Sequence, residues 1–337
     1  MNKELRKEIF KAVNEIAGNI NFSHEEFIVD DFVTINAYMN LNGKKIKLTP
    51  ISFGESFDTI QGKIEKFDYV FPHISLKNLE GKIAYIKNIS NLKTFHYLIQ
   101  AKPKAVLTNT EIKKPIYIKD FPVFYIPSLL NDQEVIINTK TKRKQFTGEN
   151  IYFDIGVGAY FIYLHFPFDS RFHNIQSMSF YSTYKTFLEL IDKLVKIKHP
   201  KGYRIRILIT DLMYSNYAGL MNHLKNTNYE NILSIFHLEN SGAGNEKLVL
   251  KNVDNIIDNF HLNRIKKIFS NTGWELKDTT LQDFSNIDYI KIPIIWFTSY
   301  PNERIYFLTK DFLNDKLTEN FANQLFYIIN NLYRESK

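Results

Sequence analysis

Apolar residues recur along the chain with two different periods, and the change of period outlines its organisation. From Leu5 to Ile20 they are spaced by three and four residues, which predicts an amphipathic helix. From about Phe27 to Ile51 the period is two, which predicts short strands separated by Asn-Gly and Ser/Pro turns. The chain therefore opens with a helix and continues into a β-rich segment.

Strands and helices alternate over the rest of the chain. Strands are predicted at 79–86, 105–108, 122–127, 135–137, 151–155, 160–164, 203–210, 232–238 and 291–298, and helices at 92–100, 128–133, 182–197, 219–225, 252–269 and 317–333. This order predicts an α/β fold with a mixed, largely parallel sheet sandwiched by helices and an inserted β-rich α/β domain.

Composition restricts the class of protein. With 337 residues, 44 % hydrophobic and 15 % aromatic, the chain is long and apolar enough to fold as two packed units or as one large unit with an insertion. The absence of cysteine excludes disulfides, thiolate zinc sites, iron–sulfur clusters and a cysteine nucleophile. No leader-like segment opens the sequence, and no apolar run approaches the roughly 20 residues that span a bilayer. We therefore expect a soluble, cytoplasmic protein without a membrane span.

The formal charge of +7 comes from 43 Lys and Arg against 36 Asp and Glu. Lys dominates, and the surplus is interpreted as spread along the chain, so nucleic acid is an unlikely partner. The densest basic run, Lys140 to Lys144, is interpreted as a solvated connector. The many Phe and Tyr residues are interpreted as core filling.

Local motifs with a known mechanism are absent. The sequence contains no His-Glu-x-x-His zinc motif, no phosphate-binding loop and no Gly-x-Ser-x-Gly elbow. The run His24-Glu25-Glu26 is interpreted as a helix cap or surface turn, and Ser241-Gly242-Ala243-Gly244 as a loop after a strand.

The order of segments after residue 148 resembles the zinc-dependent aminopeptidase family, which shares its fold with glutamate carboxypeptidase. Asp169-Ser170 resembles the family's Asp-Ser after a strand, and the segment from His237 to Gly242 resembles its Asn-x-Asp-x-x-Gly strand end. Tyr306 to Asp311 resembles its last metal-binding segment. The resemblance implies that residues 1–40 and 148–337 form a zinc-aminopeptidase-like domain.

Residues 79–137 separately resemble the protease-associated domain that is often inserted into such peptidases. The matching segments are Leu79 to Ile83, Ala101 to Val106 and Phe121 to Pro127. The resemblance implies an inserted domain over residues 45–145.

The family resemblance implies a di-zinc centre held by two His and three acidic ligands beside a Glu that acts as general base. Carried over to this sequence, the ligand set is incomplete. Two registers are possible, and Pro167 replaces a ligand in both. If Asp169 is aligned with the family's Asp, Pro167 stands at the His position; if His165 is aligned with the family's His, Pro167 stands at the bridging Asp position. Met213 and Tyr214 stand at the Glu-Glu pair, and Phe307 stands at the last His. Glu239 keeps a carboxylate at its position, and so does Asp169 in the register that matches the family's Asp-Ser.

We therefore expect a peptidase fold without its metal centre, no catalytic residues and a binding or assembly role. The vestigial positions are Asp169, Glu239 and Asp283. The predicted cleft is lined by His165, Pro167, Ser179, Met213, Tyr214 and Phe307. It would bind a peptide end or small ligand, or be filled by its own side chains, and a protein partner is the other candidate.

Three alternatives stay open. The chain is an active zinc exopeptidase with displaced ligands, or His173, His223 and His237 rebuild a metal site with Asp211 and Glu239. The third alternative is a cyclase or transferase with a single metal near Glu239.

Overall fold

The fold was analysed in a computed structural model. It describes residues 3–18, 20–53, 58–68, 78–87, 89, 98–110, 116–117, 121–127, 133–169, 178–199, 202–213, 215, 217–239, 241, 246–252, 260–272, 274, 276–279, 292–300 and 315–334. The chain divides into two compact units, Met1–Phe27 with Thr147–Lys337 (unit 1) and Ile28–Phe146 (unit 2). The chain passes between them along two long strands, β1 and β10.

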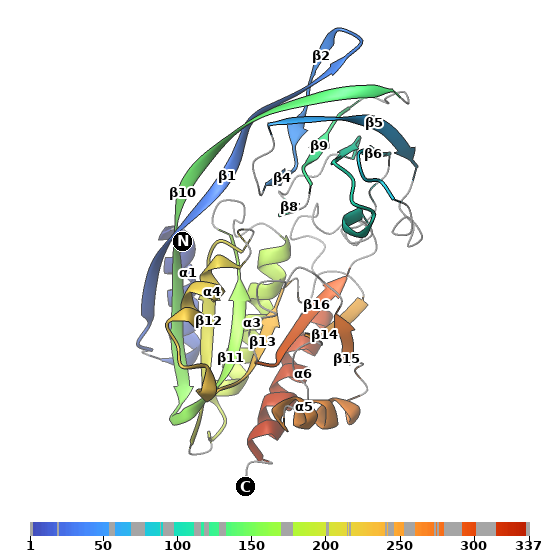
Figure 1. The fold of residues 1–337 in the computed structure, drawn as a ribbon. Coiled ribbons are helices and arrows are strands. Elements are labelled where there is room, and N and C mark those ends of the chain that lie inside the picture. The colour runs from blue at the N-terminus through green and yellow to red at the C-terminus, as the bar shows by residue number, and fades with distance from the viewer. Residues whose placement is uncertain are drawn as a thin grey trace. The chain divides into compact units, whose positions relative to one another are not determined.

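Unit 1 combines helices with a sheet (Figure 1). Its helices are α1 (Lys3–Ala17), α3 (Met178–Val195), α4 (Ala218–Lys225), a short 3-10 helix (Tyr229–Asn231), α5 (Phe260–Ser270) and α6 (Asp315–Arg334). Its strands, which include parts of β1 and β10, are β1 (Ser23–Leu41), β10 (Glu134–Gly156), β11 (Gly158–Pro167), β12 (Gly202–Thr210), β13 (Ile232–Leu238), β14 (Glu246–Asn252), β15 (Leu276–Thr279) and β16 (Ile294–Tyr300).

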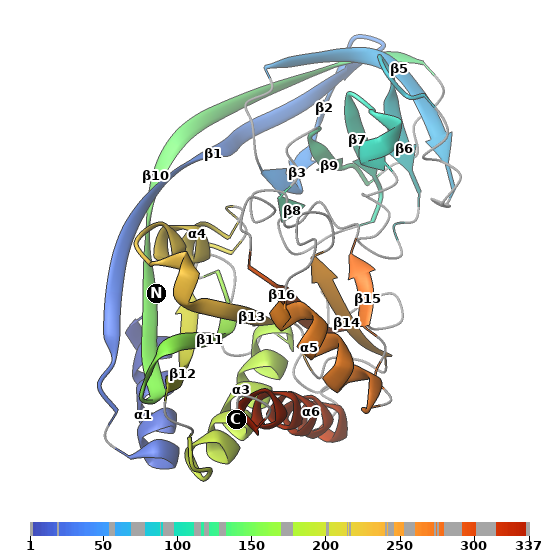
Figure 2. The same ribbon diagram turned by 60° about the horizontal axis from the view of Figure 1, so that its bottom comes forward.

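The sheet of unit 1 is mixed and largely parallel, as predicted. Its strand order is β15-β14-β16-β13-β11-β12-β10, and β11 is parallel to both β12 and β13. Helices α1, α3, α5 and α6 pack on one face through a large apolar cluster. Helix α4 covers the other face through a second cluster (Figure 2). The fold is therefore a sheet between two helical layers.

Alternation along β11 assigns its side chains to these two faces. Ile162, Leu164 and Phe166 are in the cluster of α1 and α3, whereas Tyr163 is in the cluster of α4. Because successive residues of a strand point to opposite faces, His165 lies on the α4 side of the sheet.

The strands of unit 2 are β2 (Lys44–Lys47), β3 (Thr49–Pro50), β4 (Ser52–Phe53), β5 (Thr59–Phe67), β6 (Ile83–Ile86), β7 (Ala105–Thr108), β8 (Ile116–Tyr117) and β9 (Val123–Tyr125). From β10 the series of paired strands continues in the order β10-β5-β6-β7-β9-β3. Strand β2 pairs with β1, and β4 pairs with β8 in a separate two-stranded sheet. Strands β5, β6, β7 and β9 are parallel neighbours. A separate apolar cluster that includes Ile83, Leu107 and Phe124 forms the core of this unit. The identification of residues 45–145 as a protease-associated-like domain stays a prediction.

Most predicted elements occur within a few residues of their predicted bounds, and three interpretations are wrong. Residues 23–41 form one strand rather than several short ones. The interpreted connector at Lys140–Lys144 lies inside β10. Helix α5 begins at Phe260, and Asn252 ends strand β14. The predicted helical stretch at 128–133 and the start of the helix at 92–100 lie outside the described residues.

The connector was misinterpreted because this part of β10 lacks the alternation that reveals a strand. Residues Lys142 to Gln145 are all exposed, on both sides of the backbone. Pairing with β1 satisfies the backbone here, so the side chains do not need a buried face.

No helix among the described residues is long and apolar enough to cross a membrane.

Gly219 permits the close approach of α4 to the end of β12. A Cβ atom at this position would lie 2.5 Å from Asn150 Oδ1 and 2.6 Å from the carbonyl oxygen of Asp211. The Asn150 amide also donates a hydrogen bond of 2.8 Å to the Gly219 carbonyl. A side chain at residue 219 would therefore push the helix away from the sheet.

We expect Gly219→Ala to lower the free energy of unfolding by about 1–3 kcal/mol, because overpacking displaces neighbouring backbone. Urea unfolding would measure the change. Lys225→Ala, at an exposed position of the same helix, is the matched control and should change stability by less than about 0.5 kcal/mol. Equal effects of the two substitutions would contradict this account of Gly219.

Candidate functional site

Three neighbouring parallel strands carry a carboxylate just beyond their carboxyl ends. Asp211 follows β12, Asp169 lies two residues beyond β11, and Glu239 follows β13. In open α/β sheets ligands bind at this edge of the sheet. Asp169 and Asp211 are completely buried and Glu239 is 6 % exposed, so the three carboxylates lie inside the protein.

Below these carboxylates, two histidines contact each other across the strands. The register of β11 and β13 places His165 directly opposite His237. Their Nδ1 atoms are 2.8 Å apart. His165 Nε2 lies 2.7 Å from Thr210 Oγ1, and His237 Nε2 lies 3.3 Å from Glu239 Oε2. The Tyr217 hydroxyl also donates to Glu239 Oε2, at 3.0 Å.

One arrangement of protons satisfies every member of this series, which we call the histidine chain (Thr210, His165, His237, Glu239 and Tyr217). A carboxylate accepts hydrogen bonds, so His237 donates from Nε2 and accepts at Nδ1. His165 then donates from Nδ1 and accepts at Nε2 from the Thr210 hydroxyl. Both imidazoles are neutral, and all four ring nitrogens are engaged by protein atoms.

Burial favours this neutral state. Both histidines are fully buried. Burial holds the pKa of His165 well below its usual value, and the neighbouring His237 and His223 lower the pKa further. Burial also lowers the pKa of His237, although the Glu239 carboxylate opposes this shift.

Two of the strand-end carboxylates, Asp211 and Glu239, accept hydrogen bonds from protein groups. Asp211 Oδ1 accepts a hydrogen bond of 2.7 Å from the backbone N–H of Leu212. Within the part of the chain that the structure describes, no three His, Asp or Glu side chains converge as a group that would hold a metal ion.

A second buried network lies on the α4 side of the same sheet, and the sequence analysis missed it. His223 Nδ1 donates to Glu25 Oε1 at 2.8 Å, and His223 Nε2 lies 3.3 Å from the Tyr163 hydroxyl. Burial tends to raise the pKa of Glu25, but the hydrogen bonds from His223 and Asn150 outweigh it and lower the pKa. The interpretation of His24-Glu25-Glu26 as a cap or turn is wrong, because these residues lie in β1. Glu25 joins this strand to α4.

Arg206 continues this second network toward β10. Its guanidinium donates to both carboxylate oxygens of Asp154, at 2.8 and 2.9 Å, and lies 3.5 Å from the Tyr163 hydroxyl. Burial tends to lower the pKa of Arg206, but Asp154 outweighs burial and raises it. Burial raises the pKa of Tyr163. The network joins Glu25 of β1, Asp154 of β10 and His223 of α4 to Tyr163 of β11, whose side chain is fully buried. It therefore holds β1, β10 and α4 on the sheet.

The other residues of the predicted cleft have separate surroundings. Pro167 lines a void of about 20 Å³ with apolar and aromatic residues that include Ile9 and Tyr184. Met213 is packed in the apolar cluster of α4, and Ser179 lies in the first turn of α3. Asp283, Tyr214, Phe307 and His173 lie outside the described residues. The predicted cleft therefore stays a prediction.

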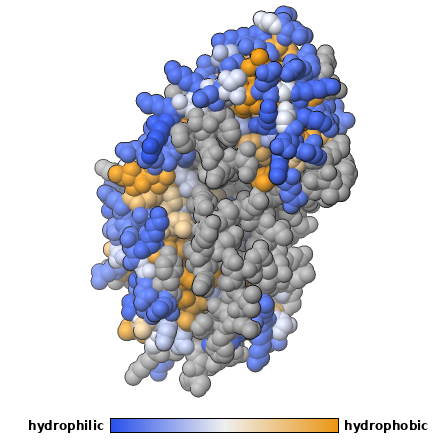
Figure 3. Space-filling model, viewed as in Figure 1, coloured by the Kyte–Doolittle hydropathy of each residue, from blue (hydrophilic) through white to orange (hydrophobic). Residues whose placement is uncertain are grey.

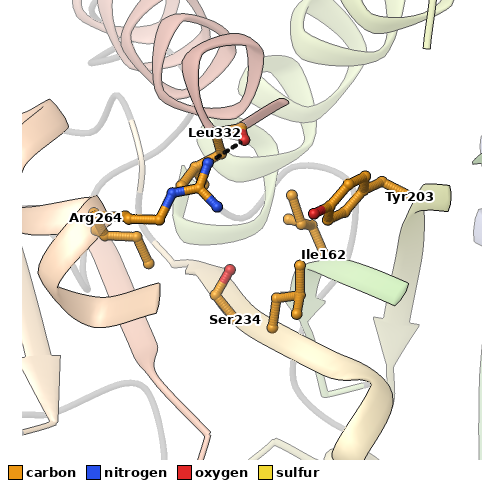
Figure 4. Close-up of a pocket in the computed structure, with 7 residues that line it drawn as sticks. Ile162, Tyr203, Ser234, Arg264 and Leu332 are labelled. Carbon is orange, nitrogen blue, oxygen red and sulfur yellow. Dashed lines mark hydrogen bonds between the residues drawn. The ribbon is translucent and has the colours of Figure 1, made fainter. Parts of the chain in front are cut away.

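A small void lies on the other face of the sheet, between β11, β12, β13, α5 and α6 (Figure 4). Its volume is about 10 Å³, and Ile162, Tyr203 and Ser234 are among its lining residues. Arg264 closes one side by donating a 2.8 Å hydrogen bond to the Leu332 carbonyl. This volume is at the lower limit for a single water molecule, so the void is part of the packed core.

Three solved structures share this fold over nearly the whole chain. An aminopeptidase from Aneurinibacillus sp. strain AM-1 has a TM-score of 0.61 at 13 % identity, covering 98 % of this chain and 88 % of that one. BSAP, a zinc aminopeptidase from Bacillus subtilis, has a TM-score of 0.59 at 13 % identity, with coverages of 97 % and 88 %. A peptidase M28 precursor from Shewanella amazonensis SB2B has a TM-score of 0.56 at 13 % identity, with coverages of 98 % and 88 %.

These likenesses confirm the zinc-aminopeptidase-like fold that the sequence predicted. No sequence-family model and no curated protein matches the chain. At 13 % identity the likeness establishes the architecture alone, and the activity must be argued from the residues of this chain.

The two neutral histidines predict a specific dependence of stability on pH. In the folded protein the pKa values of both histidines are below the ordinary 6.5. At pH values between the folded-state pKa and the unfolded-state pKa, the unfolded chain therefore binds more protons than the folded protein. Stability should therefore be full above about pH 6.5 and fall as the pH is lowered, by up to about 1.4 kcal/mol per pH unit for each histidine.

Urea unfolding between about pH 7.5 and 5.5 would measure this slope. His165→Gln should lower stability at neutral pH and flatten the slope by as much as one proton. Thr147→Ser, at an exposed position without a titratable group, is the control and should keep the full slope. A slope unchanged in His165→Gln would mean that His165 is already protonated in the fold.

Proposed function

We propose that this protein is a non-hydrolytic relative of the zinc aminopeptidases, with a binding or assembly role. The observation that supports the proposal is the histidine chain. A metal ion needs a lone pair on each ligand, and zinc sites are built from three or four such donors. In the histidine chain the lone pairs of His165 and His237 accept hydrogen bonds from Thr210 and from His165 itself.

Zinc does not fit this donor set. Binding at His165 Nε2 would break a buried 2.7 Å hydrogen bond to Thr210, and binding at His237 would separate the two rings. Each buried donor released in this way would lose its partner, which costs about 1–3 kcal/mol. Pro167 offers no side-chain donor, and Met213 offers a weakly coordinating thioether in an apolar cluster.

The strand-end carboxylates are the observation that favours the second candidate, an active zinc exopeptidase with displaced ligands. Asp169, Asp211 and Glu239 occupy the edge of the sheet at which this class of fold binds its ligands. In that case Glu239 would be a ligand or a base, and its hydrogen bonds to Tyr217 and His237 would have to break. The two candidates therefore differ in what Glu239 does.

For the binding role, we propose a peptide end or a small ligand as the occupant of the predicted cleft, or a protein partner. Since the donor atoms at the strand ends are engaged by the protein, recognition would rest on shape and apolar contact.

Metal analysis separates the two candidates. We expect the protein, purified without chelator, to contain no stoichiometric zinc, and added Co²⁺ to give no ligand-field absorption of a tetrahedral site. Release of amino acids from aminoacyl-p-nitroanilides should stay at the level of a buffer blank, with and without chelator.

Glu239→Gln serves as the matched variant. It keeps the size of the side chain, so under the proposal the metal content and the blank-level hydrolysis stay the same. Zinc at one or two ions per chain, together with chelator-sensitive hydrolysis that Glu239→Gln abolishes, would establish the exopeptidase instead.

A further inference from the structure

The positive charge of the chain is concentrated in one of its two units. Unit 2 contains 18 Lys and Arg against 11 Asp and Glu, whereas unit 1 contains 25 of each. The whole surplus of +7 therefore lies in residues 28–146. The interpretation of the surplus as spread along the chain is wrong. The difference in net charge appears when the charged residues are counted separately for each unit.

Much of this surplus lies on the long strands of unit 2. Strands β1 and β10 pair with each other, and β2 pairs with β1 through a turn at Asn42-Gly43. Six lysines are exposed on β2 and β10, namely Lys44, Lys45, Lys47, Lys140, Lys142 and Lys144. We call β2 with the unit 2 parts of β1 and β10 the basic ribbon.

The lysines of the basic ribbon are available to an outside partner. Among the described residues, no carboxylate forms an ion pair with any of the six, and the Asp30 carboxylate is engaged by Arg143. Lys45 lies over the ring of Tyr38 at 3.7 Å, and Lys144 lies over Phe146 at 5.0 Å. Such contacts leave the ammonium charge uncompensated.

Large apolar side chains are exposed on the same ribbon. Ile28 is 67 % exposed, and Val33 and Ile136 are each 37 % exposed. These three are the exposed large hydrophobic residues of unit 2 in the part of the chain that the structure describes. Figure 3 shows the same mixture, with single hydrophobic side chains among hydrophilic ones over this unit.

We propose that the basic ribbon binds an anionic lipid surface. Lysines beside an anionic bilayer contribute attraction that grows with their number, and exposed apolar side chains enter the interface between headgroups and acyl chains. The long stems of lysine lie along the apolar boundary while the ammonium groups reach the phosphates. The basic ribbon provides both components on adjacent strands.

Lipid fits the ribbon better than nucleic acid does. Arg143 is the single arginine among the 18 basic residues of unit 2, and it is paired with Asp30. Nucleic-acid interfaces favour arginine for its bidentate contacts and use uncovered aromatic rings for stacking. Here the rings of Tyr38 and Phe146 are covered by lysines.

Co-sedimentation of the full chain with vesicles tests the proposal. We expect binding to phosphatidylcholine vesicles that contain phosphatidylserine, weaker binding at high salt, and none to phosphatidylcholine alone. Each lysine near the surface contributes a factor of about five, so the triple variant Lys140→Gln, Lys142→Gln, Lys144→Gln should bind about 100-fold more weakly. Ile28→Ser with Ile136→Ser should reduce the binding that persists at high salt.

The matched control removes three exposed lysines of unit 1, with Lys225→Gln, Lys266→Gln and Lys267→Gln. It carries the same change of net charge and should bind like the unchanged protein. An equal loss in this control would overturn the assignment to the ribbon. Failure to bind anionic vesicles, with or without binding to single-stranded DNA, would overturn the lipid proposal. None of these outcomes depends on whether the protein holds zinc.

Discussion

The histidine chain combines two requirements that are hard to meet together: complete burial of two imidazoles and complete hydrogen bonding of their nitrogens. A neutral imidazole has one donor and one acceptor, so a series of imidazoles must end on a donor at one side and an acceptor at the other. Thr210 supplies the donor and Glu239 the acceptor. The register of β11 and β13 brings His165 and His237 opposite each other, so the sheet itself sets the order of the series. A slip of one residue would turn one ring to the other face and leave the second ring without a partner.

Under the proposed non-hydrolytic role, the histidine chain stabilises the strand ends in place of a metal ion. A metal holds together charged ligands that would otherwise repel each other or require solvent. The histidine chain achieves the same cohesion with neutral groups, and the apolar cluster around Met213 and Tyr217 excludes water from beside it. The architecture is shared with zinc aminopeptidases, but the chemistry at the strand ends belongs to this chain's own side chains.

The sequence predicted the regular part of the fold because buried elements show clear periodicity. The bounds of β7 and β13 agree with prediction, and the helices differ from it mainly at their ends. Residues 140–145 of β10 escaped prediction because neither of their faces is buried, so their sequence is similar to that of a loop. The histidine chain escaped for a different reason. His165 and His237 were both noted as candidates, but the contact between them depends on strand register, which is a long-range property. Glu25 escaped because its partner, His223, is 198 residues away.

The two units differ in what their charged residues do. In unit 1 acids and bases are equal in number, and some that are partly buried form ion pairs, as Asp154 does with Arg206. Charges that satisfy each other stabilise a fold and attract nothing from outside. In unit 2 much of the surplus is exposed on β2 and β10, whose residues Ile46, Val135 and Ile137 pack in or against the apolar core of the unit. The six ribbon lysines, which form no ion pair with any residue that the structure describes, repel each other, and this disfavours their clustering unless a partner neutralises them. Binding of an anionic surface by unit 2 would therefore not depend on whether unit 1 carries out a reaction.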